Sequence, residues 1–283
     1  MRRPEITRRN LAWAGGTVAA VALLVATLVS LTHDEPSLDP APFRPTTTST
    51  STTGPAAPST EPGTTTTTST TAAPPPGLSA LPARTSRVAT VRDQEGVLTV
   101  HTGPTGEATR DPVPASGDYG QPQVFLVLAE AGDRLEVLLP VRPNGSKGWI
   151  DRDDVTVASH DYQIQVSLSG FRMMVQKGSE VLVDSPVGVG AADTPTVGGE
   201  YYTWVLIDPT NAGYGSFAYG LSGFSTLESF GGGDGRLGIH GDTDPASFGR
   251  QVSHGCVRVP DDVMVRLVEE VGLPLGVPVT VVA

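Results

Sequence analysis

The chain has 283 residues and a formal net charge of −11, with 33 glycines, 25 prolines and few aromatic residues. Arginines near the start give residues 1–32 a net charge of +3, so the rest of the chain is strongly acidic. Because phosphate backbones are bound by clustered Lys and Arg, this charge excludes nucleic acid as the expected partner. The glycine and proline content, with frequent alternation of apolar residues, indicates a turn-rich, mainly β protein.

Residues 11–31 form an uncharged, mostly apolar run. A helix of this length spans about 31 Å, which matches the core of a bilayer. Since arginines precede the run, we expect residues 1–10 to be cytoplasmic and the rest of the chain to lie outside the cytoplasm. The prediction is a single-pass membrane anchor. A cleaved signal peptide, which would release a secreted protein, and a buried core helix are the alternatives.

Residues 32–82 are predicted to be a disordered linker. Fourteen of the 26 residues from Thr46 to Thr71 are threonine, and most of the others are Ser, Pro, Ala or Gly. Such a segment buries too little apolar surface to offset the entropy of ordering it. We therefore expect a tether that holds the folded part of the chain away from the membrane.

Residues 83–158 are predicted to form a small β domain. Short alternating strands are expected at 88–91, 97–101, 123–128, 134–140, 147–151 and 154–157. Residues 143–146, Pro-Asn-Gly-Ser, suit a hairpin turn. Gly148-Trp149-Ile150 followed by Asp154-Val155 resembles the closing strands of a bacterial SH3-like barrel. This domain would either bind glycan or position the active site, and the second role is preferred.

Residues 159–283 are predicted to form a second mainly β domain with one packed helix. Strands are expected at 164–168, 171–176, 180–184, 186–190, 201–207 and 277–282. The helix is expected at 261–271, where apolar residues recur at helical spacing. Asp261 is placed to cap its start and Gly272 to end it.

Cys256 is the only cysteine. An exported chain with one cysteine cannot form an internal disulfide, so the thiol is either a buried structural residue or a candidate nucleophile. Ser253-His254-Gly255-Cys256 places small, flexible backbone beside it. This sequence suits a tight turn that exposes sulfur and directs backbone N–H groups toward an oxyanion.

Two histidines could activate this thiol. His254 lies two residues before Cys256, on the same face of an extended strand, and His240 lies sixteen residues upstream. A thiol needs a base or a positive field to become a thiolate near neutral pH. The rival hypothesis is a zinc site made of these two histidines and Cys256. The spacing lacks the usual pairing of ligands, so we expect neither a metal nor a cofactor.

The segment from His240-Gly241 to Ser253-His254-Gly255-Cys256-Val257-Arg258 resembles the catalytic signature of the L,D-transpeptidase family, also called the YkuD domain. The resemblance extends over Asp161 to Ala283. Softer matches to the family lie at Asp193–Thr196, Pro186–Gly190 and Phe217–Gly220. The resemblance implies a YkuD-type, β-rich catalytic domain.

The family implies a role for each residue of the signature. Cys256 attacks as the thiolate, and His240 is the general base, oriented by the carbonyl of Gly241. The N–H groups of Gly255 and Cys256 form the oxyanion hole, with help from His254. Ser253 completes the catalytic signature.

The resemblance implies substrate contacts as well. Arg258 stabilises the site or meets a substrate carboxylate, for which its planar fork is suited. Tyr202 and Tyr219, together with Tyr201, either line the groove for the stem peptide or have a structural role. Val197-Gly198-Gly199 departs from the tighter turn of many relatives, so the alignment is loose there.

The implied reaction cross-links peptidoglycan stem peptides. Cys256 releases D-alanine from a donor tetrapeptide, and the side-chain amine of a diamino acid in an acceptor stem resolves the thioester. Water as acceptor would make the enzyme an L,D-carboxypeptidase, and an amine of a protein would attach that protein to the wall. The family also implies that carbapenem-type β-lactams acylate Cys256. The alternative from another class is a wall-binding protein without activity.

Overall fold

The computed structural model describes residues 78–283. The predictions for residues 1–10 and 11–31 and for most of the linker lie outside these residues. Between residues 78 and 283, no helix has the length and apolar character needed to cross a membrane. The described part is mainly β with a single short helix, as predicted.

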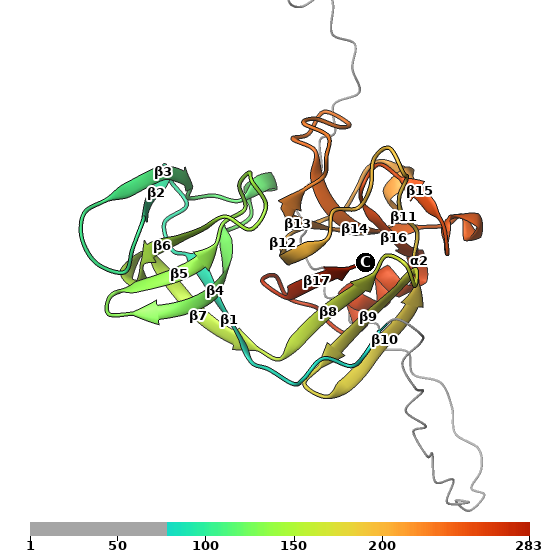
Figure 1. The fold of residues 1–283 in the computed structure, drawn as a ribbon, viewed down its shortest axis with the longest axis horizontal. Coiled ribbons are helices and arrows are strands. Elements are labelled where there is room, and N and C mark those ends of the chain that lie inside the picture. Colours follow the sequence, from blue (N-terminus) through green and yellow to red (C-terminus); the bar gives the residue numbers. More distant parts are fainter. Residues whose placement is uncertain (1–77) are drawn as a thin grey trace, which may run out of the picture. The chain divides into compact units, whose positions relative to one another are not determined.

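The first sheet is built from residues 86–160 and has the strand order β3-β2-β6-β5-β4-β1-β7 (Figure 1). Its neighbouring strands are antiparallel, and its core is formed by alternate, fully buried apolar residues such as Phe125, Leu135 and Ile150. The likeness to an SH3-like barrel stays a prediction. The strands are β1 Ser86–Val91, β2 Val97–His101, β3 Thr109–Pro114, β4 Val124–Ala131, β5 Arg134–Leu138, β6 Lys147–Asp151 and β7 Val155–His160.

The predicted hairpin turn at 143–146 is confirmed. It joins β5 and β6, and the Leu139 N–H donates to the carbonyl of Ser146 at 2.8 Å. Strand β3 was not predicted, because it is a sheet edge with five of its six residues exposed and it contains two prolines. An exposed edge strand loses the apolar alternation from which strands are recognised.

The second sheet is built from residues 162–282 and has the strand order β10-β9-β8-β17-β12-β13-β14-β16 (Figure 1). Two of its pairs, β8 with β17 and β14 with β16, are parallel. A separate two-stranded sheet pairs β11 with β15. The strands are β8 Tyr162–Ser167, β9 Arg172–Lys177, β10 Glu180–Pro186, β11 Val189–Gly190, β12 Gly199–Ile207, β13 Ala218–Phe224, β14 Arg236–Asp242, β15 Gln251–Ser253, β16 Val257–Pro260 and β17 Pro278–Val282.

The helix begins where it was predicted but is capped differently. It comprises α2 (Asp261–Val265) and a wider π turn, η5 (Arg266–Glu270), and Gly272 follows with a φ of +61°. The N-cap position is Pro260, and the carboxylate of Asp261 makes no cap. Instead it accepts hydrogen bonds from the backbone N–H and the hydroxyl of Ser216, each at 2.7 Å. The predicted capping role of Asp261 was therefore wrong.

The end of the predicted linker is anchored on the second sheet. The side-chain amide of Gln176 pairs with both backbone groups of Leu81, at 3.0 and 2.9 Å. The amide of Gln163 donates to the carbonyl of Pro82 at 3.1 Å, and Leu78 is 4 % exposed. The linker was predicted to extend to residue 82, whereas residues 78–82 are held by β8 and β9.

The two sheets share a small apolar cluster. Val88, Val124, Leu126 and Leu138 of the first sheet pack with β12 residues of the second, which are Tyr202, Trp204 and Val205. Two hydrogen bonds cross the same contact, from the Tyr202 hydroxyl to the Val124 carbonyl (3.0 Å) and from the Trp204 indole to the Gln123 amide oxygen (3.1 Å). Strand β12 therefore belongs to one sheet and supports the other.

Candidate active site

The parallel pairing of β14 and β16 places Cys256 beside the strand that carries His240. The register pairs Ile239 with Val257 and His240 with Arg258, so Cys256 comes next to Gly238. A Cβ added at Gly238 would lie 3.7 Å from the Cys256 sulfur. Parallel strands require a crossover between them, which explains why the two residues are sixteen positions apart in the sequence.

The thiol of Cys256 is uncharged at rest. Burial raises its pKa, while a hydrogen bond from the backbone N–H of Gly238 and the positive charge of Arg258 act in the opposite direction. The sulfur thus lies in an environment that disfavours a free thiolate but offers partners that stabilise negative charge when it forms.

The imidazole of His240 is held in one tautomer. Its Nδ1 lies 2.8 Å from the carbonyl oxygen of Gly241, which can only accept, so Nδ1 carries the proton. Nε2 is then left with a lone pair. Burial lowers the pKa of this histidine, against the effect of the Gly241 carbonyl, and the side chain is neutral near pH 7. The ring of Tyr214 packs on the imidazole with its centroid 4.9 Å away.

The turn before Cys256 is held by its own backbone and by Ser253. The Ser253 hydroxyl donates to the carbonyl of Cys256 at 2.5 Å and accepts from the Gly255 N–H at 3.1 Å. Gly255 has a φ of +123°, and a Cβ there would lie 2.9 Å from that of Ser225. The N–H of Gly255 was predicted to face an oxyanion, but it is bonded to Ser253. The N–H of Cys256 remains the candidate oxyanion donor.

Two threonines brace the same turn from a neighbouring loop. The Thr196 hydroxyl accepts from the Gly190 N–H and donates to the carbonyl of Gly255, both at 2.8 Å. The Thr194 hydroxyl donates to the carbonyl of Ser253 at 3.1 Å. In the sequence, only the likeness to the family pattern at Asp193–Thr196 pointed to this loop. The spacing of residues along the chain does not show that its threonines contact the turn.

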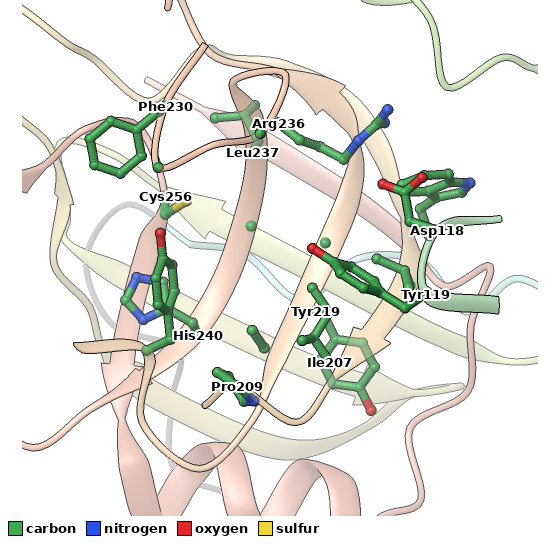
Figure 2. A pocket seen from close by; sticks show the side chains of 18 of the residues that line it. Asp118, Tyr119, Ile207, Pro209, Tyr219, Phe230, Arg236, Leu237, His240 and Cys256 are labelled. Carbon is green, nitrogen blue, oxygen red and sulfur yellow. The ribbon is translucent and has the colours of Figure 1, made fainter. Parts of the chain in front are cut away.

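Cys256 and His240 line one cavity of about 370 Å³. Figure 2 shows both side chains on the same side of this cavity, with Tyr119 reaching into it from the other side. Among residues 78–283, no three His, Cys, Asp or Glu side chains are grouped closely enough to hold a metal ion. The cavity therefore presents a thiol, a neutral imidazole whose Nε2 carries a lone pair, and a turn with a backbone N–H. These are the nucleophile, the base and the oxyanion donor that acyl transfer needs.

Residues 161–281 match the family model described as the YkuD L,D-transpeptidase catalytic domain. This part of the chain is similar to the YkuD family. The Bacillus subtilis (strain 168) protein YkuD is 32 % identical over 120 residues, which cover 42 % of this chain and 65 % of that protein. The Bacillus licheniformis YkuD is 32 % identical over 98 residues, which cover 35 % and 53 %. The chain thus spans less than two thirds of the length of either relative.

Solved structures are also similar. The catalytic domain of the L,D-transpeptidase from E. faecium is 24 % identical, with 43 % of this chain and 97 % of that domain covered and a TM-score of 0.33. The L,D-transpeptidase from Mycobacterium smegmatis is 13 % identical, with 72 % and 100 % covered and a TM-score of 0.36.

Not every predicted residue of the YkuD signature lies at the cavity. His254 is exposed, and its ring stacks on that of Phe230 with centroids 4.5 Å apart and an angle of 25° between the planes. It does not line the cavity that contains Cys256 and His240. His254 therefore lies at the edge of the turn, stacked on Phe230, which itself lines the cavity.

The guanidinium of Arg258 is bonded to other residues of the protein. Its Nη1 lies 3.2 Å from a carboxylate oxygen of Asp242 and 3.5 Å from the Ser247 hydroxyl. Burial of Asp242 acts to raise its pKa, but hydrogen bonds from Asp244 and Ser247 and the charge of Arg258 lower it overall. Arg258 is not among the residues that line the cavity. Its positive charge acts to lower the pKa of Cys256, and its contact with a substrate carboxylate stays a prediction.

Of the three tyrosines predicted to line the groove or to have a structural role, two are buried in the fold and one lines the cavity. Tyr202 is 0 % exposed, and its hydroxyl is bonded to Val124, so it has the structural role that was the alternative to substrate binding. Tyr201 donates to the carbonyl of Val197 at 3.0 Å and is also buried. Tyr219 lines the cavity, although its hydroxyl turns away and donates to the carbonyl of Leu273 at 2.7 Å.

Proposed function

We propose that the protein is a peptidoglycan L,D-transpeptidase in which Cys256 transfers an acyl group between stem peptides. The observation that carries the proposal is the pairing, in one cavity, of the only cysteine of the chain with an imidazole whose tautomer is fixed. A binding protein needs neither a nucleophile nor an oriented base. The match of residues 161–281 to the YkuD family model supports the reaction class.

In the first step the thiol proton of Cys256 passes to Nε2 of His240, and sulfur attacks the carbonyl carbon between the third residue and the terminal D-alanine of a donor tetrapeptide. The oxyanion of the tetrahedral intermediate accepts a hydrogen bond from the Cys256 N–H. Collapse breaks the C–N bond, and the His240 imidazolium gives its proton to the amine of D-alanine. A thioester remains on Cys256.

In the second step the side-chain amine of a diamino acid in an acceptor stem attacks the thioester carbon. His240 takes the proton of the attacking amine and returns it to the departing sulfur. One amide bond has formed for each one broken, so the cycle needs no cofactor. Water in place of the amine gives an L,D-carboxypeptidase, and an amine of a protein gives attachment of that protein to the wall.

The test uses the full-length protein, a carbapenem and a synthetic tetrapeptide. Intact mass spectrometry is expected to show one carbapenem adduct on the native protein and none on Cys256→Ala. The tetrapeptide is expected to release D-alanine and to yield a cross-linked dimer. Release without a dimer would establish the carboxypeptidase, and a native protein with neither adduct nor release would leave only the wall-binding alternative.

For the location of this activity, we propose that residues 11–31 anchor the chain in the membrane with residues 32–283 outside the cytoplasm. The apolar run and the arginines before it support this arrangement. Protease added to intact spheroplasts should then digest the folded part, and the fragment left in the membrane should contain the N-terminus. Release of the whole folded part into the medium would instead indicate a cleaved signal peptide.

A further inference from the structure

One wall of the catalytic cavity comes from the small β domain. Asp118 and Tyr119 belong to the short 3-10 turn η1 (Asp118–Gly120), between β3 and β4, and both line the cavity that contains Cys256. Figure 2 shows the Tyr119 ring pointing into the cavity and Asp118 beside Arg236, across from Cys256 and His240. The YkuD match begins only at residue 161, so these two side chains come from outside the matched segment.

Two glutamines fasten this turn to the catalytic sheet. The side-chain amide of Gln121 donates to the Leu206 carbonyl at 2.5 Å and accepts from the Leu206 N–H at 3.2 Å. Gln123 accepts from the indole of Trp204 at 3.1 Å. Since Leu206 and Trp204 lie on β12, the turn is aligned with the same sheet that carries the catalytic residues.

The backbone of the turn is unusual at the residue that enters the cavity. Tyr119 has φ +58° and ψ +27°, a left-handed conformation that side chains other than glycine seldom adopt. Non-glycine residues in this region cost free energy and concentrate at binding and catalytic sites. Gly120, which follows, has a φ of +68°. The strained backbone at Tyr119 thus directs an aromatic side chain into the cavity that contains Cys256 and His240.

Carboxylates outnumber cationic side chains at this end of the cavity. The charged side chains that line it are Asp118, Asp234 and Arg236. Arg236 is already bonded to Asp234 at 2.9 Å, and it is stacked on the rings of Trp204 and Phe224 at 4.0 and 4.3 Å. Asp118 has no hydrogen-bonded side-chain partner among the described residues. Asp118 is exposed, but its partial desolvation raises the pKa of the carboxyl group, Arg236 opposes this and Asp234 adds to it, so a further cation would stabilise the carboxylate.

We propose that Asp118 and Tyr119 form a subsite for a protonated primary amine at the end of a diamino-acid side chain of a stem peptide. Asp118 supplies the counter-charge, and the electron-rich face of Tyr119 lies against the ammonium or its methylene stem. The subsite rests on the proposed function and deepens it. It gives the small β domain a part in substrate recognition in addition to positioning.

The amine can belong to the donor stem, where it takes no part in the reaction, or to an acceptor stem that binds here before its amine loses the proton and moves to the thioester. Two measurements on the full-length protein distinguish them. The donor measurement compares D-alanine release in a single turnover, with the protein in excess, from a tetrapeptide with a free side-chain amine and from the same peptide acetylated at that amine. The first release of D-alanine needs no acceptor. The acceptor measurement gives the ratio of cross-linked to hydrolysed product at a fixed acceptor concentration. Asp118→Asn is expected to reduce the free-amine preference, or the transfer ratio, about tenfold, as for loss of a charge-assisted hydrogen bond.

The control is Asp111→Asn, which removes the same charge from an exposed position on β3 of the same domain, away from the cavity. It should leave both ratios at the native values. Both readouts are ratios obtained from one protein preparation, so a loss of folded protein does not imitate the effect. A fall in the donor preference assigns the amine to the donor, and a fall in the transfer ratio assigns it to the acceptor.

Equal ratios in Asp118→Asn and native protein, with native D-alanine release intact, would overturn the subsite and leave the transpeptidase proposal standing. Absence of D-alanine release from native protein would instead overturn the proposed function. As a second variant, Tyr119→Leu keeps an apolar side chain but removes the aromatic face. It should reduce the same ratio as Asp118→Asn by a smaller factor, and an increase in that ratio would contradict the contact between Tyr119 and the amine.

Discussion

The Nδ1 of His240 donates to the carbonyl of the very next residue, Gly241, across 2.8 Å. This bond removes the choice between tautomers and leaves Nε2 as the acceptor. The Gly241 carbonyl orients the ring, and burial lowers the pKa of His240, so the imidazole is neutral near pH 7. A neutral imidazole in the same cavity as a neutral thiol has a direct consequence for the pH dependence of the reactivity of Cys256.

The thiol of Cys256 should react with iodoacetamide more rapidly as pH rises, without a plateau in the acid range. Burial raises the pKa of the thiol and lowers the pKa of His240, so both groups are uncharged near neutral pH. Thiolate therefore accumulates only as pH rises toward and above about 8.5, the ordinary pKa of a cysteine. The measurement is the rate of mass increase between pH 5 and pH 10.

Because Cys256 is the only cysteine, Cys256→Ala provides a complete control for labelling of other residues. A preformed thiolate–imidazolium pair would behave differently, with a pKa of about 3–4 and a constant rate from there to neutral pH. Such a plateau would contradict the neutral pair.

Replacement of Gly255 by alanine should abolish turnover and destabilise the fold. The residue has a φ of +123°, and an added Cβ would lie 2.9 Å from the Cβ of Ser225. We expect a loss of about 1–3 kcal/mol in the free energy of unfolding, measured in urea, together with loss of D-alanine release. Gly178→Ala is the matched control. Its φ is +57° but its Cβ would meet nothing within 4 Å, so it should lose about 1 kcal/mol and keep activity. Full activity in Gly255→Ala would show that the turn is not held as described.

The presence of Cys256 and His240 in one cavity could be predicted because both residues belong to short motifs. A single thiol, a Ser-His-Gly-Cys turn and a histidine-glycine pair each leave a signal in the sequence. The strands at 97–101 and 147–151 were likewise predicted with their observed bounds, since alternation of apolar residues is a local property.

The strands that carry the site were harder to predict. Strands β13 and β14 each contain two glycines and are buried along most of their length, so neither alternates between apolar and polar residues. Gly220 shows why glycine is required there, because a Cβ would lie 2.6 Å from a methyl group of Val205 on β12. The need for glycine arises from a neighbouring strand, and the sequence of β13 itself does not reveal it.

The contacts that link distant segments were beyond sequence reasoning altogether. Asp261 had a conventional capping position, but its carboxylate binds Ser216, 45 residues away. Asp118 and Tyr119 carry no motif, and they reach the cavity only because Gln121 and Gln123 pair with β12. His254 was placed near the sulfur by strand periodicity, whereas the tight turn at Gly255 directs it toward Phe230.

Thr196→Val should impair catalysis by releasing the turn that carries Cys256. The hydroxyl of Thr196 joins the Gly190 N–H to the Gly255 carbonyl within a buried region, and valine has the same shape without the hydrogen bonds. Two buried backbone groups would lose their partner, which costs about 1–3 kcal/mol each. We expect a lower kcat for D-alanine release and a lower urea midpoint. Thr196→Ser retains the hydroxyl and should restore most of kcat. If the serine variant were as impaired as the valine variant, the methyl group would be the part that matters.

Tyr202→Phe should weaken the contact between the two sheets without changing recognition of the donor peptide. The Tyr202 hydroxyl lies in the shared apolar cluster and donates to the carbonyl of Val124 at 3.0 Å, and its removal leaves that buried carbonyl without this donor. The expected loss is about 1–3 kcal/mol in the free energy of unfolding, with KM for the tetrapeptide unchanged. Tyr162→Phe, which removes a longer bond to Val271 (3.3 Å) in a less buried setting, should cost less. A higher KM in Tyr202→Phe at native stability would return this tyrosine to the substrate groove.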